Sequence, residues 1–237
     1  MSDGLSGVIA GETNLCTVGK EGAGLTYCGY DIYELVNKST FEEVAFLLLH
    51  GRLPDRKELA AYVSSLKILR SLPDDLKTIL ELIPCNAHPM DVLRTGVSFL
   101  GNIEPENEDF SCQLDRANRL LACMPSMLLY WYRFHIDGVR INTENNEESI
   151  AGHFLHLLHD TKPSKLHRES LDKTLILYAE HEFNASTFAG RVITATKADI
   201  YSAVAGAIGA LRGPLHGGAN EAAMDLIDSY KTCDDAI

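Results

Sequence analysis

Apolar residues recur at helical spacing along most of the chain, in blocks that end at glycine or proline. The block TFEEVAFLLLHGRLP starts with a Thr-x-x-Glu capping box at Thr40 and stops at Gly51 and Pro54. Three further blocks are also bounded by glycine or proline: LPDRKELAAYVSSLKILRSLP, PDDLKTILELIP and HPMDVLRTGVSFLG. The pattern predicts a compact helix of about three to four turns in each block.

The remaining segments complete a mostly helical prediction. A long apolar stretch, ANRLLACMPSMLLYWYRFH, contains Pro125, which we expect to kink or interrupt its helix. Further helices are predicted over SIAGHFLHLLHD, over residues 171–187 and over residues 198–212. The first thirty residues instead alternate short β-like runs with glycine, which indicates small hairpins. The expected fold is therefore all-α with small amino-terminal β-hairpins.

Composition and charge narrow the classes of partner. The chain has 237 residues, of which 46% are hydrophobic, and this is enough to fill a sizeable core. Its net charge of −12 argues against a nucleic-acid partner, because binding to phosphates needs a basic surface. No apolar run of about 18 residues and no signal-like start is visible, so we expect a soluble cytoplasmic protein without a membrane partner. The six cysteines lack Cys-x-x-Cys spacing and are expected to be ordinary thiols.

Three histidines in GHFLHLLHD are the first candidates for chemistry. His153, His156 and His159 are spaced three apart, so they would share one face of a helix. No His-Glu-x-x-His motif is present and no carboxylate is spaced to complete a metal shell. We therefore expect no metal site here and interpret these side chains as packing and interface histidines.

The segment LYAEHEFNAST carries two polar side chains on a face that is otherwise apolar. If residues 171–187 form one helix, His181 and Asn184 share a face with Leu177 and Tyr178. Buried polar groups need hydrogen-bond partners, so they either bond to each other and to the backbone or bind a polar ligand. The spacing leaves both alternatives open.

A histidine between small residues is the third candidate. In LRGPLHGGANEA, His216 follows the predicted end of a helix and precedes a new helix that we expect to begin near Ala219. Unpaired N–H groups at the start of a helix suit a negatively charged oxygen, and a nearby imidazole could donate a hydrogen bond to an enolate or a carbonyl. The alternative is a turn that uses glycine for its backbone angles and carries an incidental histidine.

The predicted helix over residues 198–212 has a face of small residues. Ala203, Gly206, Ala207 and Ala210 lie at helical spacing, which lets another helix approach closely. A two-fold arrangement would bury this apolar strip against its own copy. We therefore expect a homodimer through helices 171–187 and 198–212.

Together these motifs resemble the citrate synthase family, and within it most closely the 2-methylcitrate synthases. GALRGPLHGGANEAAM is similar to the family's first catalytic-histidine segment, and LYAEHEFNASTF resembles its oxaloacetate-binding helix. SGVIAGETNLCTVGKEGAGLTY, FEEVAFLLLHGRLP, HPMDVLRTGVS, LLYWY and SIAGHFLHLLH also resemble sequences of that branch.

The resemblance implies a condensation of propionyl-CoA with oxaloacetate that gives 2-methylcitrate and CoA, with no resident cofactor. His216 would stabilise the enol as the catalytic residue, His181 would bind oxaloacetate, and Leu215 would lie along the CoA arm. Asn184 is a further candidate for substrate binding. The alternatives are a citrate synthase that uses acetyl-CoA, or a non-catalytic helical dimerisation module.

The resemblance also implies a division into domains, and the sequence departs from the family pattern in two places. Residues 1–30 would form a hairpin segment, 31–216 the amino-terminal part of the large domain, and 217–237 the start of the small domain. Cys28 stands where the family usually has arginine, which puts a local ion pair or local packing in doubt. The sequence ends at Ile237, before the family's second catalytic histidine, its aspartate base and its carboxylate-binding arginines. We therefore expect this chain alone to be inactive.

Overall fold

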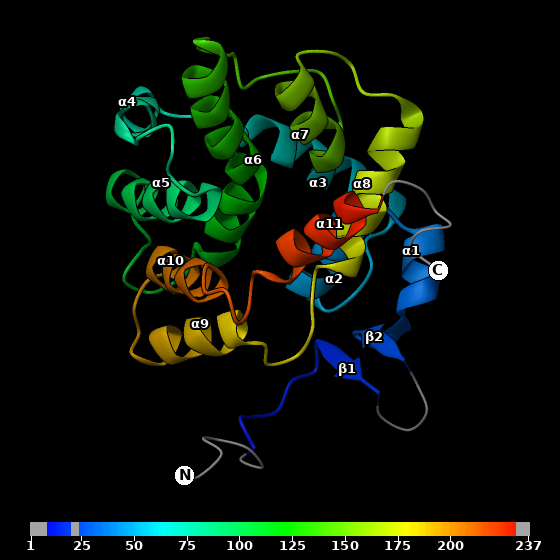
Figure 1. The fold of residues 1–237 in the computed structure, drawn as a ribbon. Coiled ribbons are helices and arrows are strands. Elements are labelled where there is room, and N and C mark those ends of the chain that lie inside the picture. Colours follow the sequence, from blue (N-terminus) through cyan, green and yellow to red (C-terminus); the bar gives the residue numbers. More distant parts are fainter. Residues whose placement is uncertain (1–8, 20–23, 231–237) are drawn as a thin grey trace.

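The computed structural model describes residues 9–19 and 24–230, which form a mostly helical molecule with a small sheet at one side (Figure 1). The strands are β1 Cys16–Val18, β2 Leu25–Tyr27 and β3 Tyr30–Asp31. The helices are α1 Ile32–Lys38, α2 Phe41–His50, α3 Arg56–Ile68, α4 Asp74–Leu82, α5 Pro89–Ile103, α6 Gln113–Asp137, α7 Ile150–His159, α8 Lys165–Leu177, α9 Ala185–Ala195, α10 Ile200–Leu211 and α11 Ala219–Ser229. The predicted all-α class with amino-terminal hairpins is confirmed.

The sheet is antiparallel, in the order β1-β2-β3. Cys16 pairs with Tyr27 between β1 and β2, and Tyr27 pairs with Tyr30 between β2 and β3. The two-residue connection at Cys28 and Gly29 has positive φ at both positions, 48° and 86°, as a tight hairpin of the primed type requires. Cys28 therefore adopts a left-handed backbone conformation in this turn. Residues 20–23, which the prediction placed in a hairpin, lie outside the described residues.

Side-chain caps explain why the early helices begin where the sequence predicts. Thr40 and Glu43 form the expected capping box at the start of α2, which ends at Gly51 with a left-handed φ of 74°. Asp55 and Glu58 form a second box at the start of α3. These local hydrogen bonds use backbone N–H groups that a helix start otherwise leaves unpaired.

Of the two outcomes expected at Pro125, a kink or an interruption, the interruption is wrong, because α6 runs through Pro125 as one helix of 25 residues. Proline removes one N–H donor from the helical ladder and its ring crowds the carbonyl group four residues earlier, but packing can hold the helix on both sides. Neighbouring residues of α6 are deeply buried: Cys123 and Met127 have no exposed surface. The tertiary contacts of this central helix therefore outweigh the local preference of proline.

Two hydrophobic clusters meet at α6. One cluster joins the sheet to α1, α2, α3, α7 and α8 and includes Tyr27, Val44 and Leu66. The other joins α4, α5 and α10 and includes Leu80 and Val97. Ala122 of α6 belongs to the first cluster, whereas most of its buried residues belong to the second. The long helix thus connects the two halves of the core (Figure 1).

The small-residue face of α10 is occupied within the chain. Helix α9 lies alongside α10 (Figure 1), and a Cβ atom at Gly206 would overlap the end of the Ile193 side chain in α9. Gly190 of α9 approaches the carbonyl oxygen of Ala203, with 3.6 Å between that oxygen and an added Cβ. The predicted close helix contact is therefore confirmed, but its partner is α9. The inference that this face is left open for a second copy is wrong.

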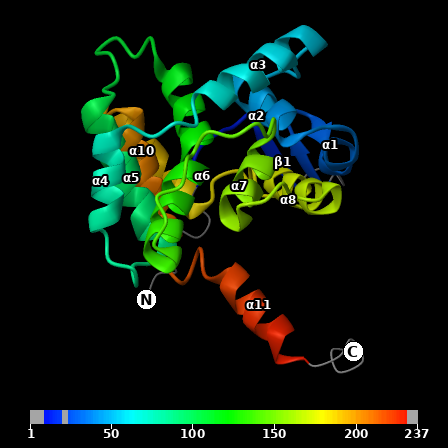
Figure 2. The same ribbon diagram turned by 90° about the horizontal axis from the view of Figure 1, so that it is seen from above.

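Helix α11 begins at Ala219, as the sequence predicts, and projects away from the other helices (Figure 2). Several of its apolar side chains are exposed, among them Met224 and Ile227. Residues 231–237, part of the segment predicted to start a second domain, lie outside the described residues. Across residues 9–19 and 24–230 no helix is long and apolar enough to cross a membrane. The expected cytoplasmic location stays a prediction.

Candidate functional site

The turn that carries His216 is compact and depends on glycine. After α10 ends, the backbone N–H groups of His216 and Gly217 both donate to the carbonyl oxygen of Gly213, at 3.0 and 2.9 Å. A Cβ atom at Gly217 would overlap the carbonyl oxygen of Leu211, and one at Gly218 would lie 2.9 Å from that of Pro214. The small residues around His216 thus let the backbone fold back on the end of α10.

The segment that carries His181 is a loop, which corrects the predicted single helix over residues 171–187. Helix α8 ends at Leu177 and α9 begins at Ala185, so residues 178–184 are not helical. The predicted shared face does not exist, and Leu177 and Tyr178 are 50% and 66% exposed. His181 lies on this loop with an exposed side chain.

The break between α8 and α9 has a physical cause on each side. The hydroxyl group of Tyr27 donates to the carbonyl oxygen of Ile176 at 3.0 Å or of Leu177 at 3.2 Å, which are among the last carbonyl groups of α8. The amide side chain of Asn184 accepts from the backbone N–H of Thr187 at 2.9 Å and caps the start of α9. Asn184 therefore has a local structural role that uses its side-chain oxygen.

One hydrogen bond joins the two candidate segments. Oγ of Ser186, in the first turn of α9, lies 2.6 Å from Nε2 of His216. His216 is half-buried, and its imidazole contacts this hydroxyl group. The structure thus brings His216 to the helix that directly follows the His181 loop. Sequence reasoning missed Ser186, although its place five residues after His181 was a usable signal.

The other predicted site residues lie at the edges of this region. Leu215 is fully exposed beside His216. No distance in the structure tests a role for His181, Asn184 or Leu215 in ligand binding. These three roles stay predictions.

Of the three histidines of α7, His153 is a packing residue, as the sequence interpretation predicts. Nε2 of His153 lies 3.0 Å from Oγ of Ser126, and the residue has no exposed surface. Burial, reinforced by nearby Arg70, lowers the pKa of His153 to about 3. His156 lies 3.6 Å from the Glu147 carboxylate, whereas His159 is exposed at the end of the helix. The three side chains thus occupy three different environments.

Cysteine thiols and clustered metal ligands are two further sources of chemistry in a protein. Cys16, Cys28, Cys85, Cys112 and Cys123 are free, and Cys233 lies outside the described residues. Burial raises the pKa of the Cys123 thiol to about 12, which disfavours a reactive thiolate. Within the described part of the chain, no three histidine, cysteine or carboxylate side chains are grouped to hold a metal ion.

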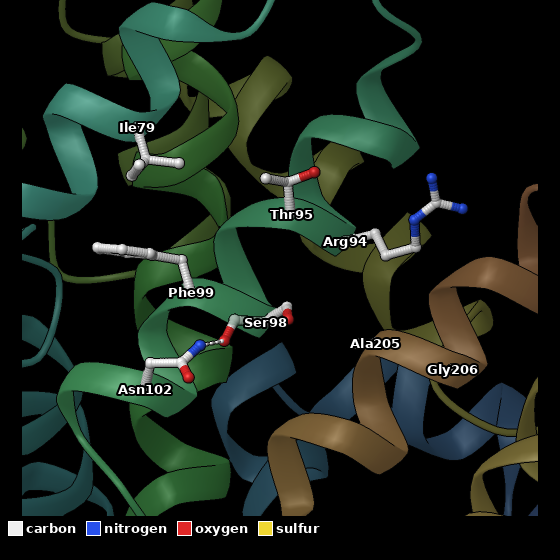
Figure 3. A pocket seen from close by; sticks show the side chains of 8 residues that line it. All are labelled: Ile79, Arg94, Thr95, Ser98, Phe99, Asn102, Ala205 and Gly206. Carbon is white, nitrogen blue, oxygen red and sulfur yellow. Dashed lines mark hydrogen bonds between the residues drawn. The ribbon is translucent and has the colours of Figure 1, made fainter.

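Two pockets lie away from the candidate segments. The first has a volume of about 670 Å³ and lies between α4, α5 and α10, with Arg94, Ser98 and Asn102 on one side and Gly206 on the other (Figure 3). The second, about 560 Å³, is lined by residues around the start of α7, including Glu147 and Arg168. Neither contains His181, Asn184, Leu215 or His216. These two pockets therefore do not coincide with the site that the motifs indicate.

Comparison with known proteins places these motifs in a family. Residues 4–237 match the family model described as the C-terminal domain of citrate synthase. The chain is 60% identical over 233 residues to a 2-methylcitrate synthase of Shewanella oneidensis, covering 98% of this chain and 62% of that protein. It is 39% identical over 236 residues to a citrate/2-methylcitrate synthase of Bacillus subtilis, covering 99% of this chain and 63% of that protein. The chain thus spans less than two thirds of the length of these relatives.

A solved structure gives the same result. The fold matches citrate synthase from Thermoplasma acidophilum, determined as a ternary complex with carboxymethyl coenzyme A and oxaloacetate, with a TM-score of 0.87. The two chains are 30% identical, and the match covers 98% of this chain and 61% of that one. Sequence and fold agree over nearly all of the 237 residues. The chain belongs to the citrate synthase family.

Proposed function

We propose that these residues serve a 2-methylcitrate synthase, which condenses propionyl-CoA with oxaloacetate to give 2-methylcitrate and CoA. The observation that carries the proposal is the Ser186–His216 hydrogen bond, which joins the two segments whose sequences resemble the family's catalytic and oxaloacetate-binding motifs. The name of the Shewanella oneidensis relative supports the choice of reaction.

The proposed chemistry begins with transfer of a proton from the carbon next to the thioester carbonyl to a carboxylate base, which the resemblance assigns to an aspartate in the part of the relatives that these residues do not match. The resulting enolate attacks the keto carbon of oxaloacetate and forms the new carbon–carbon bond. Water then cleaves the thioester and releases CoA. Negative charge develops on the thioester oxygen in the first step, so a hydrogen-bond donor at that oxygen lowers the barrier.

His216 is the proposed donor. If the Ser186 hydroxyl group donates to Nε2, the single proton of a neutral imidazole is on Nδ1, and Nδ1–H is free to donate to the thioester oxygen. The serine thus selects the tautomer that the reaction needs. The Ser186–His216 distance of 2.6 Å is within the hydrogen-bond range that this arrangement requires.

Oxaloacetate is the proposed ligand of the loop formed by residues 178–184. The exposed side chain of His181 is available to donate to an oxygen of the dianion, and Asn184 fixes the start of α9 beside it. Leu215, which is fully exposed, is proposed to contact the acyl-CoA arm. Residues 217–237 are proposed to begin a second, smaller domain, because α11 projects from the body (Figure 2).

Assays of CoA release test the proposal. The 237 residues correspond to 62% of the Shewanella oneidensis relative, and we propose that they are inactive alone. A chain extended with the part of that relative which these residues do not match is expected to release CoA from propionyl-CoA in an oxaloacetate-dependent way. Turnover by the 237 residues at the rate of the extended chain would contradict the proposed inactivity.

Acetyl-CoA is the rival substrate, and the name of the Bacillus subtilis relative covers both activities. One methylene group distinguishes the two thioesters, which is worth about 1–3 kcal/mol of discrimination. Comparing kcat/KM for both thioesters in the extended chain decides between them. A preference for acetyl-CoA would assign citrate synthase activity instead. No CoA release with either would favour a non-catalytic helical module.

A homodimer is the proposed assembly, through the region of residues 171–187 and 198–212. The small-residue face of α10 is covered by α9, whose residues 188–195 lie between these two ranges. The support comes from the exposed side of α9, where Phe188 and Val192 are 38% and 53% exposed. Light scattering is expected to give a dimer that Val192→Glu disrupts. Ile68→Glu on α3, at a 77% exposed position, is the matched control. A monomer at micromolar concentration would contradict the proposal.

A further inference from the structure

The buried hydroxyl group of Tyr27 forms hydrogen bonds at the start of the loop formed by residues 178–184. Tyr27 lies on β2 with no exposed surface. Its hydroxyl group lies 3.0 Å from the carbonyl oxygen of Ile176, and it accepts from the backbone N–H of Glu180 at 3.4 Å. The Tyr27 side chain therefore bonds to both the end of α8 and the loop that follows it. These partners lie about 150 positions after Tyr27 in the sequence.

Glu182, which follows His181 in the loop, is also bonded to the sheet. Its backbone adopts a left-handed φ of 56°, which disfavours any residue with a Cβ atom. Its carboxylate accepts from the backbone N–H of Val18 in β1 at 3.2 Å. The strained conformation is thus tied to the edge of the sheet by the residue's own side chain.

Phe183, which follows Glu182, is also held by contacts with other segments. The guanidinium group of Arg191 in α9 lies over the Phe183 ring at 4.8 Å from its centroid. A Cβ atom at Gly11 would lie 3.2 Å from the same ring, so the segment before β1 passes close to Phe183. The residues on both sides of His181 are therefore held, while the His181 side chain itself is exposed.

We propose that the β1–β2 hairpin is the support that presents His181 to oxaloacetate, with Tyr27 and Glu182 as positioning residues for that ligand. The inference rests on the proposed role of His181 in binding oxaloacetate. Holding a binding side chain in its bound geometry before the ligand arrives reduces the conformational entropy lost on binding. Strain that the surroundings enforce next to a binding residue is typical of such sites.

Tyr27→Phe tests the first positioning residue, because it removes only the hydroxyl group. In the extended chain it is expected to raise the KM for oxaloacetate about three- to tenfold, with kcat changed by less than about twofold. In the 237-residue chain, amide hydrogen exchange is expected to become faster at residues 179–184. Tyr201→Phe is the matched control, since the Tyr201 hydroxyl group is also buried but has no hydrogen-bond partner in the described part of the chain. It should change neither measurement.

Three substitutions at Glu182 separate positioning from stability. Glu182→Gln keeps an oxygen that can accept from Val18 and should preserve the KM for oxaloacetate. Glu182→Ala loses the acceptor and should raise this KM. Glu182→Gly also loses the acceptor but relieves the backbone strain, so the KM should rise without loss of thermal stability.

The outcomes distinguish this inference from the proposed function. If His181→Ala raises the KM for oxaloacetate but Tyr27→Phe and Glu182→Ala leave it unchanged, the proposed function stands and the hairpin is not its support. If His181→Ala has no effect on oxaloacetate, the proposed role of His181 is wrong and the inference falls with it. Equal effects of Tyr27→Phe and Tyr201→Phe on hydrogen exchange would also overturn it.

Discussion

Oγ of Ser186 and Nε2 of His216 lie 2.6 Å apart, although the two residues are separated by 30 positions and belong to different elements. The contact brings the turn after α10 to the first turn of α9, directly after the loop that carries His181. When the hydroxyl group donates to Nε2, the single proton of a neutral imidazole lies on Nδ1. The relationship between these two side chains is the central feature of the candidate site.

Ser186→Ala is expected to lower kcat about tenfold in the extended chain, because the tautomer of His216 is then no longer selected and about 1.4 kcal/mol of barrier lowering is lost. Steady-state kinetics with propionyl-CoA measure the change, and the KM for oxaloacetate should stay close to its original value. Ser202→Ala, which removes an exposed hydroxyl group of α10, is the control and should leave kcat unchanged. An unchanged kcat in Ser186→Ala would show that the hydrogen bond is not used.

The two histidines should differ in their kinetic signatures. His216→Ala removes a donor to charge that develops during the reaction, so kcat should fall about 100- to 1000-fold with little change in oxaloacetate binding. His181→Ala removes a contact to a ground-state ligand and should chiefly raise the KM for oxaloacetate. Equal effects of both changes on oxaloacetate affinity would contradict this division of roles.

Gly217→Ala should distort the turn that carries His216, because its Cβ atom would overlap the carbonyl oxygen of Leu211. We expect at least about a tenfold loss of kcat in the extended chain, since imidazole placement depends on this turn. Gly213→Ala is the matched control in the same turn, because its Cβ atom would lie 3.4 Å from the nearest carbonyl oxygen. If both variants behave alike, the close approach at Gly217 is not what shapes the site.

The buried His153 should make stability depend on pH. Its pKa is lowered from 6.5 to about 3 by burial, so between these values the unfolded chain binds a proton that the folded chain does not. Stability is therefore present above about pH 6.5 and falls as the pH drops towards 3, by up to about 1.4 kcal/mol per pH unit from this residue.

Urea unfolding at pH 7 and pH 5 measures this dependence. Other groups also titrate in the range, so the quantity to compare is the loss of unfolding free energy in the original chain against that in His153→Gln. The variant should lose less stability on acidification, although it is less stable at pH 7. An identical loss in both chains would exclude His153 as the source.

The sequence by itself determined the helices whose ends are defined locally. Thr40 with Glu43 and Asp55 with Glu58 satisfy backbone groups within one turn, so the starts of α2 and α3 can be read from neighbouring residues. The hairpins and the start of α11 near Ala219 follow from local turn and glycine patterns in the same way. The resemblance of the motifs also identified the family, because long ordered segments carry that information without coordinates.

Only the tertiary structure decided the features that depend on residues far apart in the chain. The predicted helix over residues 171–187 breaks because Tyr27, about 150 positions earlier, bonds to the end of α8. The small-residue face of α10 serves α9, because Ile193 fills the space above Gly206. The bond between Ser186 and His216 depends on the packing of α9 against α10, since local propensity contains no information about which distant side chain will approach.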